Sequence, residues 1–341
     1  MSARLDGDIM GIKIVQPGLL ATIQDLGRYG VQKYGVIVGG AMDASSLRIA
    51  NMLVGNCEEE GVLEVTLYGT SLLFESDELI SITGGNLRPA VDGKEVPMWR
   101  PLLIRKGSVL KFHAAVSGCR AYVSFSGGIQ VPIVMKSKST YLRAGIGGFQ
   151  GRKLQKNDVF ECGKRTELGE ELFQQLQIEP TCLSWSVNYT SFVTFHKTKT
   201  IRVIRGSEYE RFNEESIKNF LSTPYSISTQ ADRMGYRLTG QTVHLKEPFD
   251  LLSEGVTYGT IQVPSNGQPI ILMADRQTTG GYPKIGQVIT ADLPSLAQMQ
   301  ATDTVHFQEV TLEEAQMALL QQEKELYVLK LGMDLKRLQQ E

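Results

Sequence analysis

A run of hydrogen-bonding side chains follows a strand-like segment late in the chain, directly before two glycines. The run is Asp275, Arg276, Gln277, Thr278 and Thr279. An arginine offers a planar fork of donors that suits a carboxylate or a phosphate, and a neighbouring aspartate can orient that fork. The glycines let a ligand approach the backbone closely. The same residues also suit a structural Arg–Asp pair at a strand end, so both interpretations stay open.

Two further groups of residues repeat this chemistry. Upstream, Asp232 and Arg233 precede Gly235, Tyr236 and Arg237, which again places an Asp–Arg pair beside a glycine. In the first half of the chain, Ser139, Thr140 and Arg143 supply hydroxyls and a cation next to a glycine-rich turn. Donors of this kind beside flexible backbone can hold an anion. We therefore expect anion-binding groups in both halves.

The elements that must position these residues are mainly strands. Residues 260–263 and 269–274 are apolar segments joined by a Ser-Asn-Gly turn, which predicts a β-hairpin. Short strand-like segments bounded by glycine or proline recur along the chain and indicate barrels or sandwiches. Helical periodicity follows Asp43, and Thr311 opens a capping box at the head of a C-terminal helix.

The length of 341 residues favours more than one domain. We expect β domains over residues 12–185 and 196–309, followed by a helical tail over 311–341. The apolar stripe of that tail is typical of a helix that docks on its own domain or on a partner subunit.

Composition excludes several classes of protein. The net charge of −2 without a basic tract argues against a nucleic-acid binder. The cysteines are widely spaced without a CxxC pair, and the histidines are isolated, so neither a disulfide framework nor a structural zinc site is expected. No segment has the apolar length of a membrane span, and we expect a soluble, cytoplasmic protein with reduced thiols.

The motifs together resemble one family. Residues 231–238, 253–256, 261–264, 266–269 and 274–284 are similar to the signature of the biotin-dependent carboxyltransferase-like family, and the resemblance extends from about residue 14 to residue 307. This family includes allophanate hydrolase subunit 2, the carboxyltransferase region of urea amidolyase and the C subunit of 5-oxoprolinase, also called KipA. The resemblance is greatest to the last branch, and it implies two cyclophilin-like β-barrel domains in tandem.

The resemblance also implies a reaction. In the 5-oxoprolinase branch, ATP, with or without Mg²⁺, drives the opening of 5-oxoproline to L-glutamate. The reaction is carried out by a complex with the A subunit and a KipI-like B subunit. Activity is then expected only in the complex. Two alternatives are a carboxyltransferase component of a urea carboxylase type, with biotin carried by a partner, and a KipA-like regulatory protein that antagonises a kinase inhibitor.

Roles for the candidate residues follow as a hypothesis. Cationic contacts would come from Arg233, Arg237 and Arg276. Asp232, Glu254 and Asp275 would orient them or handle protons and a magnesium ion, although no metal-binding set is assigned. The residues expected to position substrate are Tyr236, Gln262, Gln277, Thr278 and Thr279. The hypothesis requires residues 232–237 and 275–279 to converge on one pocket for an anionic small molecule.

Overall fold

The computed structural model describes residues 11–178, 182–249 and 251–338, and side chains up to residue 335. The chain forms two compact units. The first contains residues 11–26 and 46–188, and the second contains residues 27–45 together with the chain from Tyr189 onward. The sequence-based division assigned residues 27–45 to the first domain, whereas they pack with the second unit. Local patterns could not show this, because that segment is a glycine-rich loop without an apolar period of its own.

The first unit consists of two sheets around one core. A six-stranded sheet has the order β11-β1-β4-β9-β6-β7, and a five-stranded sheet has the order β2-β3-β10-β5-β8. Apolar side chains alternate along the strands and meet in a buried cluster that includes Ile14, Phe74 and Phe125. The elements are β1 (Ile12–Pro17), β2 (Leu20–Gln24), α1 (Ala44–Leu53), β3 (Val62–Thr66), β4 (Thr70–Phe74), β5 (Glu78–Asn86), β6 (Ala90–Val91), β7 (Lys94–Glu95), β8 (Pro101–Ile104), β9 (Val109–Lys111), β10 (Ser117–Phe125), β11 (Val159–Phe160) and α2 (Glu167–Ile178).

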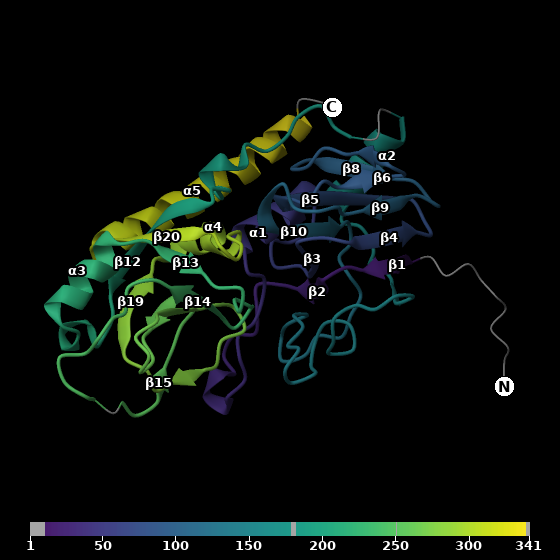
Figure 1. Ribbon diagram of the computed structural model, residues 1–341. Helices are drawn as coiled ribbons and strands as arrows, with labels where there is room; N and C mark the ends of the chain where they lie inside the picture. Colours follow the sequence, from purple (N-terminus) through teal and green to yellow (C-terminus); the bar gives the residue numbers. More distant parts are fainter. Residues whose placement is uncertain (1–10, 179–181, 250, 339–341) are drawn as a thin grey trace, which may run out of the picture. The chain divides into compact units, whose positions relative to one another are not determined.

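The second unit contains a closed barrel, with the strand order β12-β19-β16-β17-β14-β13-β20 (Figure 1). Its core includes Phe220, Tyr225 and Phe307, and the rings of Phe220 and Phe307 stack with 4.5 Å between centroids. The strands are β12 (Thr198–Arg205), β13 (Tyr225–Ile227), β14 (Gly235–Thr239), β15 (Glu254–Gly255), β16 (Thr260–Gln262), β17 (Ile270–Leu272), β18 (Thr279–Gly280), β19 (Lys284–Val288) and β20 (Thr304–Glu309). The helices are α3 (Glu214–Ser222), α4 (Leu293–Ala297) and α5 (Leu312–Leu338), with short 3₁₀ turns at η1 (Gln32–Tyr34), η2 (Tyr189–Ser191), η3 (Tyr209–Arg211) and η4 (Thr290–Asp292).

The expectation of a mainly β chain with few helices is confirmed. The predicted hairpin is formed by β16 and β17, with Ile261 opposite Ile271. The capping box is also present: the backbone N–H of Thr311 donates to Glu314 at 2.8 Å, and that of Glu314 donates to the Thr311 hydroxyl at 3.1 Å. It opens α5, a 27-residue helix that packs against η4 and β12 (Figure 1).

Candidate functional site

A cleft of about 420 Å³ lies on the second unit, where β14, β16 and β17 place their polar ends. Its lining is Gln230, Asp232, Met234, Gly235, Arg237, Gln262, Pro264, Ser265, Asn266, Ile270, Leu272, Gln277 and Tyr282. The cleft therefore brings together four of the predicted residues: Asp232, Arg237, Gln262 and Gln277. The two sequence clusters do meet at one cavity, but each contributes only part of its side chains.

Arg237 supplies the cationic group of this cleft. It lies in the middle of β14, where alternation puts Tyr236 and Leu238 in the core and leaves Arg237 exposed. Among the described residues, no carboxylate lies within ion-pair distance of its guanidinium. A cation in such a position can bind an anionic ligand without first breaking an internal pair.

Asp232 is held at the start of the turn that leads into β14. Its Oδ1 accepts hydrogen bonds from the backbone N–H groups of Met234 at 2.8 Å and Gly235 at 3.1 Å. This is an Asx turn, which fixes the carboxylate at the entry to β14. One carboxylate oxygen is thus used for structure, and the other is available to a ligand.

Gln262 and Gln277 add amide groups to the lining. The side-chain nitrogen of Gln262 donates to the carbonyl of Tyr282 at 3.3 Å. Gln262 also lies against Gly280, where an added Cβ would come within 2.4 Å of its Nε2. The glycine in β18 therefore leaves the space that the Gln262 amide occupies. Gln277 is exposed and lies three residues before that glycine.

Arg233 and Asp275 form a buried ion pair with each other and do not line the cleft. Arg233 donates through Nε to Oδ2 and through a terminal nitrogen to Oδ1, both at 2.8 Å. The same terminal nitrogen donates to the Gly40 carbonyl at 2.6 Å, which ties the 27–45 segment to the barrel. This corrects the expectation that both residues contact substrate. Asp275 does form a structural pair, but with Arg233 and not with its neighbour Arg276. The two parallel hydrogen bonds between Arg233 and Asp275 compensate for the cost of removing both charges from water.

Tyr236 is likewise a core residue. It is 2% exposed, and its hydroxyl donates toward the carbonyls of Ala297 and Met299, each at 3.4 Å. The expected role in positioning substrate is not compatible with this placement. Strand alternation explains the result, because neighbours on a strand point to opposite faces.

Arg276 is half-buried beside the ring of Tyr258, with its guanidinium carbon 5.9 Å from the ring centroid. Its buried Nε has no hydrogen-bond partner, and burial lowers the pKa of its guanidinium. Tyr258 in turn donates to the Met42 carbonyl at 2.8 Å. Arg276 does not line the 420 Å³ cleft. It retains donor capacity that the described structure does not use.

Glu254, Thr278 and Thr279 lie on the small β15–β18 ribbon next to the cleft. Glu254 pairs with Gly280 and Gly255 with Thr279. The Glu254 carboxylate accepts from the Lys284 ammonium at 2.6 Å, and Glu208 lies 3.5 Å from the same nitrogen. Glu254 is therefore part of an ion-pair network and does not line the cavity. The backbone carbonyl of Thr278 accepts from Val256, so these threonines hold the ribbon in place.

The donor cluster predicted in the first unit surrounds an anion of the protein itself, the carboxylate of Asp25. The hydroxyls of Ser137 and Ser139 donate to Oδ1 of Asp25 at 2.8 and 2.5 Å, and the backbone N–H of Lys138 donates to Oδ2 at 2.6 Å. Thr140 donates to the carbonyl of Ile23 at 3.0 Å. Arg143 is exposed on a separate turn. The expectation of an external ligand at Ser139, Thr140 and Arg143 is corrected accordingly.

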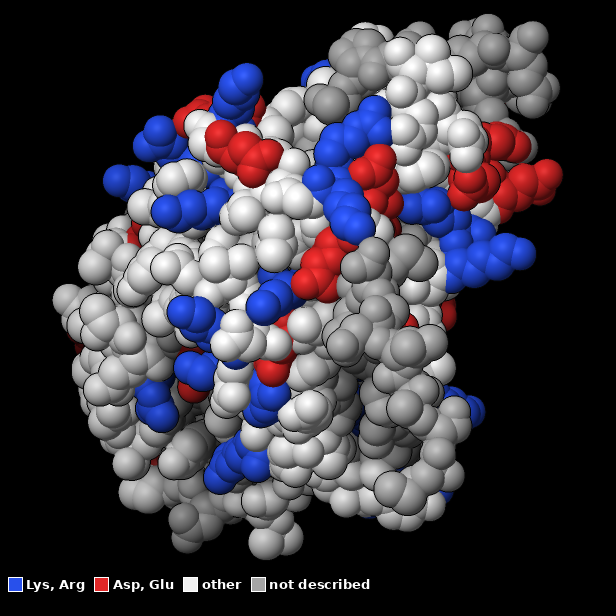
Figure 2. Space-filling model, turned by 90° about the vertical axis from the view of Figure 1, so that its right-hand side faces the viewer, with Lys and Arg blue, Asp and Glu red and all other residues white. Residues whose placement is uncertain are grey.

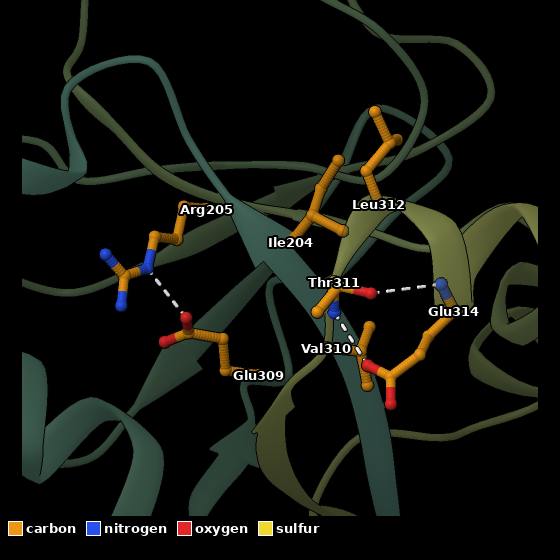
Figure 3. A pocket seen from close by; sticks show the side chains of 7 residues that line it. All are labelled: Ile204, Arg205, Glu309, Val310, Thr311, Leu312 and Glu314. Atoms are coloured by element: carbon orange, nitrogen blue, oxygen red, sulfur yellow. Dashed lines mark hydrogen bonds and ion pairs between the residues drawn. The ribbon is translucent and has the colours of Figure 1, made fainter.

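A second cavity, of about 540 Å³, lies at the root of α5 (Figure 3). Its lining is Ile204, Arg205, Glu309, Val310, Thr311, Leu312 and Glu314. Arg205 donates to Glu309 at 2.6 Å, and the capping box uses Thr311 and Glu314 (Figure 3). Because Arg205 pairs with Glu309 and Glu314 accepts from the backbone N–H of Thr311, this cavity offers a ligand less than the cleft at Arg237.

Sequence reasoning missed Gln230, Asn266 and Tyr282, which complete the lining of the cleft. Asn266 belongs to the hairpin turn, and Tyr282 follows the two glycines; both lie in the segments that resemble the family signature, but neither was assigned a role in the site. Their polar side chains beside predicted residues were the available signal. No local pattern distinguishes a turn asparagine that faces solvent from one that faces a cavity.

Other classes of site find no support in the described residues. Within that part of the chain, no group of three or more His, Cys, Asp or Glu side chains is placed to hold a metal ion. None of its helices has the length and apolarity to cross a membrane. All four cysteines are free thiols. On the face drawn in Figure 2, basic and acidic side chains are interspersed, as the small net charge predicts.

Comparison with known proteins places this geometry in context. The family described as "Carboxyltransferase domain, subdomain A and B" matches residues 34–309. The C subunit of 5-oxoprolinase from Haemophilus influenzae is 40% identical over 308 residues, which cover 90% of this chain and 93% of that protein. The protein of the same name from Escherichia coli is 39% identical over 314 residues, covering 92% and 96%.

A solved structure is similar over nearly the whole chain. The crystal structure of the Kluyveromyces lactis urea carboxylase matches with a TM-score of 0.85 and 27% identity. The match covers 94% of this chain but 29% of that one. Both β units therefore correspond to one region of a larger enzyme.

Proposed function

Because the chain belongs to the family of carboxyltransferase domains, subdomains A and B, we propose that it is the C subunit of an ATP-dependent 5-oxoprolinase. In this proposal the complex opens 5-oxoproline to L-glutamate together with the A and B subunits. Identity of 40% and 39% over nearly the whole length of two proteins named as the C subunit of 5-oxoprolinase supports membership of such a complex. The proposal includes a direct contribution of this chain to catalysis.

The observation that carries the proposal is the unpaired Arg237 in the 420 Å³ cleft of the described chain. The substrate 5-oxoproline has a carboxylate, a lactam N–H and a lactam carbonyl. Arg237 would bind the carboxylate, and the second oxygen of Asp232 would accept the lactam N–H. The Gln277 amide would donate to the lactam carbonyl. These contacts would hold the ring in one orientation.

The lining also bears on where ATP binds. A triphosphate spreads its charge over several oxygens and needs several cationic groups, whereas this cleft is lined by Arg237 alone among lysines and arginines of the described chain. The residues therefore fit one small anion and do not fit a nucleotide. We place ATP outside this cleft, and we assign no step in it to the nucleotide or to Mg²⁺.

The resulting role for this chain is to bind and orient the lactam. An amide carbonyl is a weak electrophile because nitrogen donates electrons to it. Donors such as the Gln277 amide that favour charge on the carbonyl oxygen make the ring carbon easier to attack. Arg237 would bind the substrate carboxylate equally well in the ground state and in the transition state. Its loss should therefore affect KM more than kcat.

The test is glutamate release from 5-oxoproline and ATP by the reconstituted complex, with each component omitted in turn. We expect activity only when this chain is present. Arg237→Ala should raise KM roughly 10-fold to 150-fold, because hydrogen bonds to charged groups contribute about 1.5–3 kcal/mol. Arg143→Ala, which removes another exposed arginine, from the first unit, is the matched control and should leave KM unchanged. Full turnover without this chain would contradict the proposal.

A urea-type carboxyltransferase is the second candidate, because the chain matches a urea carboxylase structure over 94% of its length. In that case the chain would act with a biotin-bearing partner protein. ATP consumption stimulated by urea and bicarbonate, but not by 5-oxoproline, would favour this candidate. If neither substrate stimulates turnover and the chain still binds a KipI-like B subunit, the KipA-like regulatory role is supported.

A further inference from the structure

Helix α5 lies outside the part of the chain that matches the family domain. The family match ends at residue 309, and α5 begins at Leu312. The helix contacts its own unit through one side, where Leu326 is 1% exposed. Its other residues are therefore not required by the chemistry of the cleft, and their pattern needs a separate explanation.

The outer side of α5 carries an apolar stripe, with Lys324 near its middle. Its members are Met317, Leu320, Tyr327, Val328, Leu331 and Leu335, which are between 42% and 65% exposed. At about 100° per residue, they fall within an arc of about 100°, on the side of the helix away from Leu326. Exposed apolar residues that occur singly are ordinary, but six of them on one side of a helix mark an interaction surface.

Charge along α5 indicates what covers the stripe. Residues 312–325 contain four glutamates and one lysine, a net charge of −3, and residues 326–338 contain three basic residues and one aspartate, a net charge of +2. An antiparallel copy of the same helix places the acidic half of each against the basic half of the other. The helix dipoles then also oppose favourably.

The ends of the stripe set the register of such a pair. In an antiparallel pair the two stripes overlap along their whole length when Met317, the first member of one stripe, lies opposite Leu335, the last member of the other.

We propose that two copies of this chain associate through the outer stripe of α5, in an antiparallel and two-fold symmetric helix pair. Such a pair is self-complementary, since the first half of each stripe packs against the second half of the other across the two-fold axis. The ammonium of Lys324, near the middle of the stripe, reaches the rim while its stem packs on apolar neighbours.

Sedimentation equilibrium of the full chain at micromolar concentrations tests the proposal. We expect a mass twice that of one chain, and a single-chain mass for the double variant Leu320→Glu, Leu331→Glu. The matched control is Leu252→Glu, which places the same charge on an exposed leucine outside α5 and should leave the dimer intact. A monomeric wild-type chain, or a dimer that persists in the double variant, would overturn the proposal.

Cysteine cross-linking tests the orientation, in a Cys57→Ser background because Cys57 is exposed. A mixture of Met317→Cys and Leu335→Cys chains should form a disulfide between the two variants. Neither variant alone should, because its two copies of one position lie about 27 Å apart in the antiparallel pair. Self-cross-linking of Leu335→Cys would overturn the antiparallel arrangement. If the chain alone is monomeric, and the double variant loses binding of the B subunit, the stripe belongs to that contact instead and the proposal is wrong.

Discussion

Two regions of the molecule contain the same chemical groups and use them differently. Around residues 137–140, serine hydroxyls and a backbone N–H surround the carboxylate of Asp25, and the cluster is closed. In the cleft of the second unit, Arg237 and the second oxygen of Asp232 are open to a ligand. Residue type predicts that a group binds an anion. Burial and the nearest internal partner decide whether that anion is part of the protein.

Breaking the internal pair of the second unit should have the largest effect. Arg233→Met would leave the buried Asp275 carboxylate without its partner, and we expect a loss of about 3–5 kcal/mol in the free energy of unfolding. Arg237→Met should change it by no more than about 0.5 kcal/mol, because that side chain is exposed and unpaired. Urea denaturation of both variants measures the difference. Equal losses would mean that the two arginines do not have the distinct roles described here.

The closed cluster of the first unit should respond in stability alone. Ser139→Ala removes a donor from the buried Asp25 carboxylate, and we expect a cost of about 1–3 kcal/mol in the free energy of unfolding, measured by urea denaturation. The KM for 5-oxoproline of the folded complex should not change. A raised KM with unchanged stability would show instead that Ser139 contacts substrate.

A small change behind the cleft should alter activity with little loss of stability. Gly280→Ala places a Cβ within 2.4 Å of Nε2 of Gln262, so that amide must move within the cleft. We expect about a tenfold lower kcat/KM, which corresponds to about 1.4 kcal/mol. Gly281→Ala is the matched control, because its added Cβ would meet no atom closer than 3.4 Å. Equal activities of the two variants would remove Gln262 from the site.

The smallest expected effect concerns a partly buried amine outside both regions. Burial lowers the pKa of Lys199 from 10.5 to about 8. The folded state therefore disfavours the charged amine, and this cost is fully present below pH 8. It declines between pH 8 and 10.5, since the unfolded chain then binds more protons. Relative to Lys199→Met, the wild-type chain should gain stability as the pH rises from about 7 to about 9.5, as thermal unfolding will show. A constant difference would contradict the lowered pKa.

The sequence predicted the elements better than the partners of individual side chains. The β16–β17 hairpin and α5 are encoded by local turn and capping residues, which neighbouring positions specify. Strand alternation could also have placed Tyr236 in the core and Arg237 outside it. The pairing of Arg233 with Asp275, and of Ser139 with Asp25, depends on residues 42 and 114 positions apart. No local pattern contains that information.

Direct binding of 5-oxoproline to the reconstituted complex, measured by isothermal titration calorimetry without ATP, tests the central assignment of the open cleft. Arg237→Ala should weaken binding roughly 10-fold to 150-fold, the effect of losing a hydrogen bond to a charged group. Arg143→Ala should bind as the wild type does. Unchanged binding in Arg237→Ala, or a loss confined to Arg143→Ala, would contradict the account.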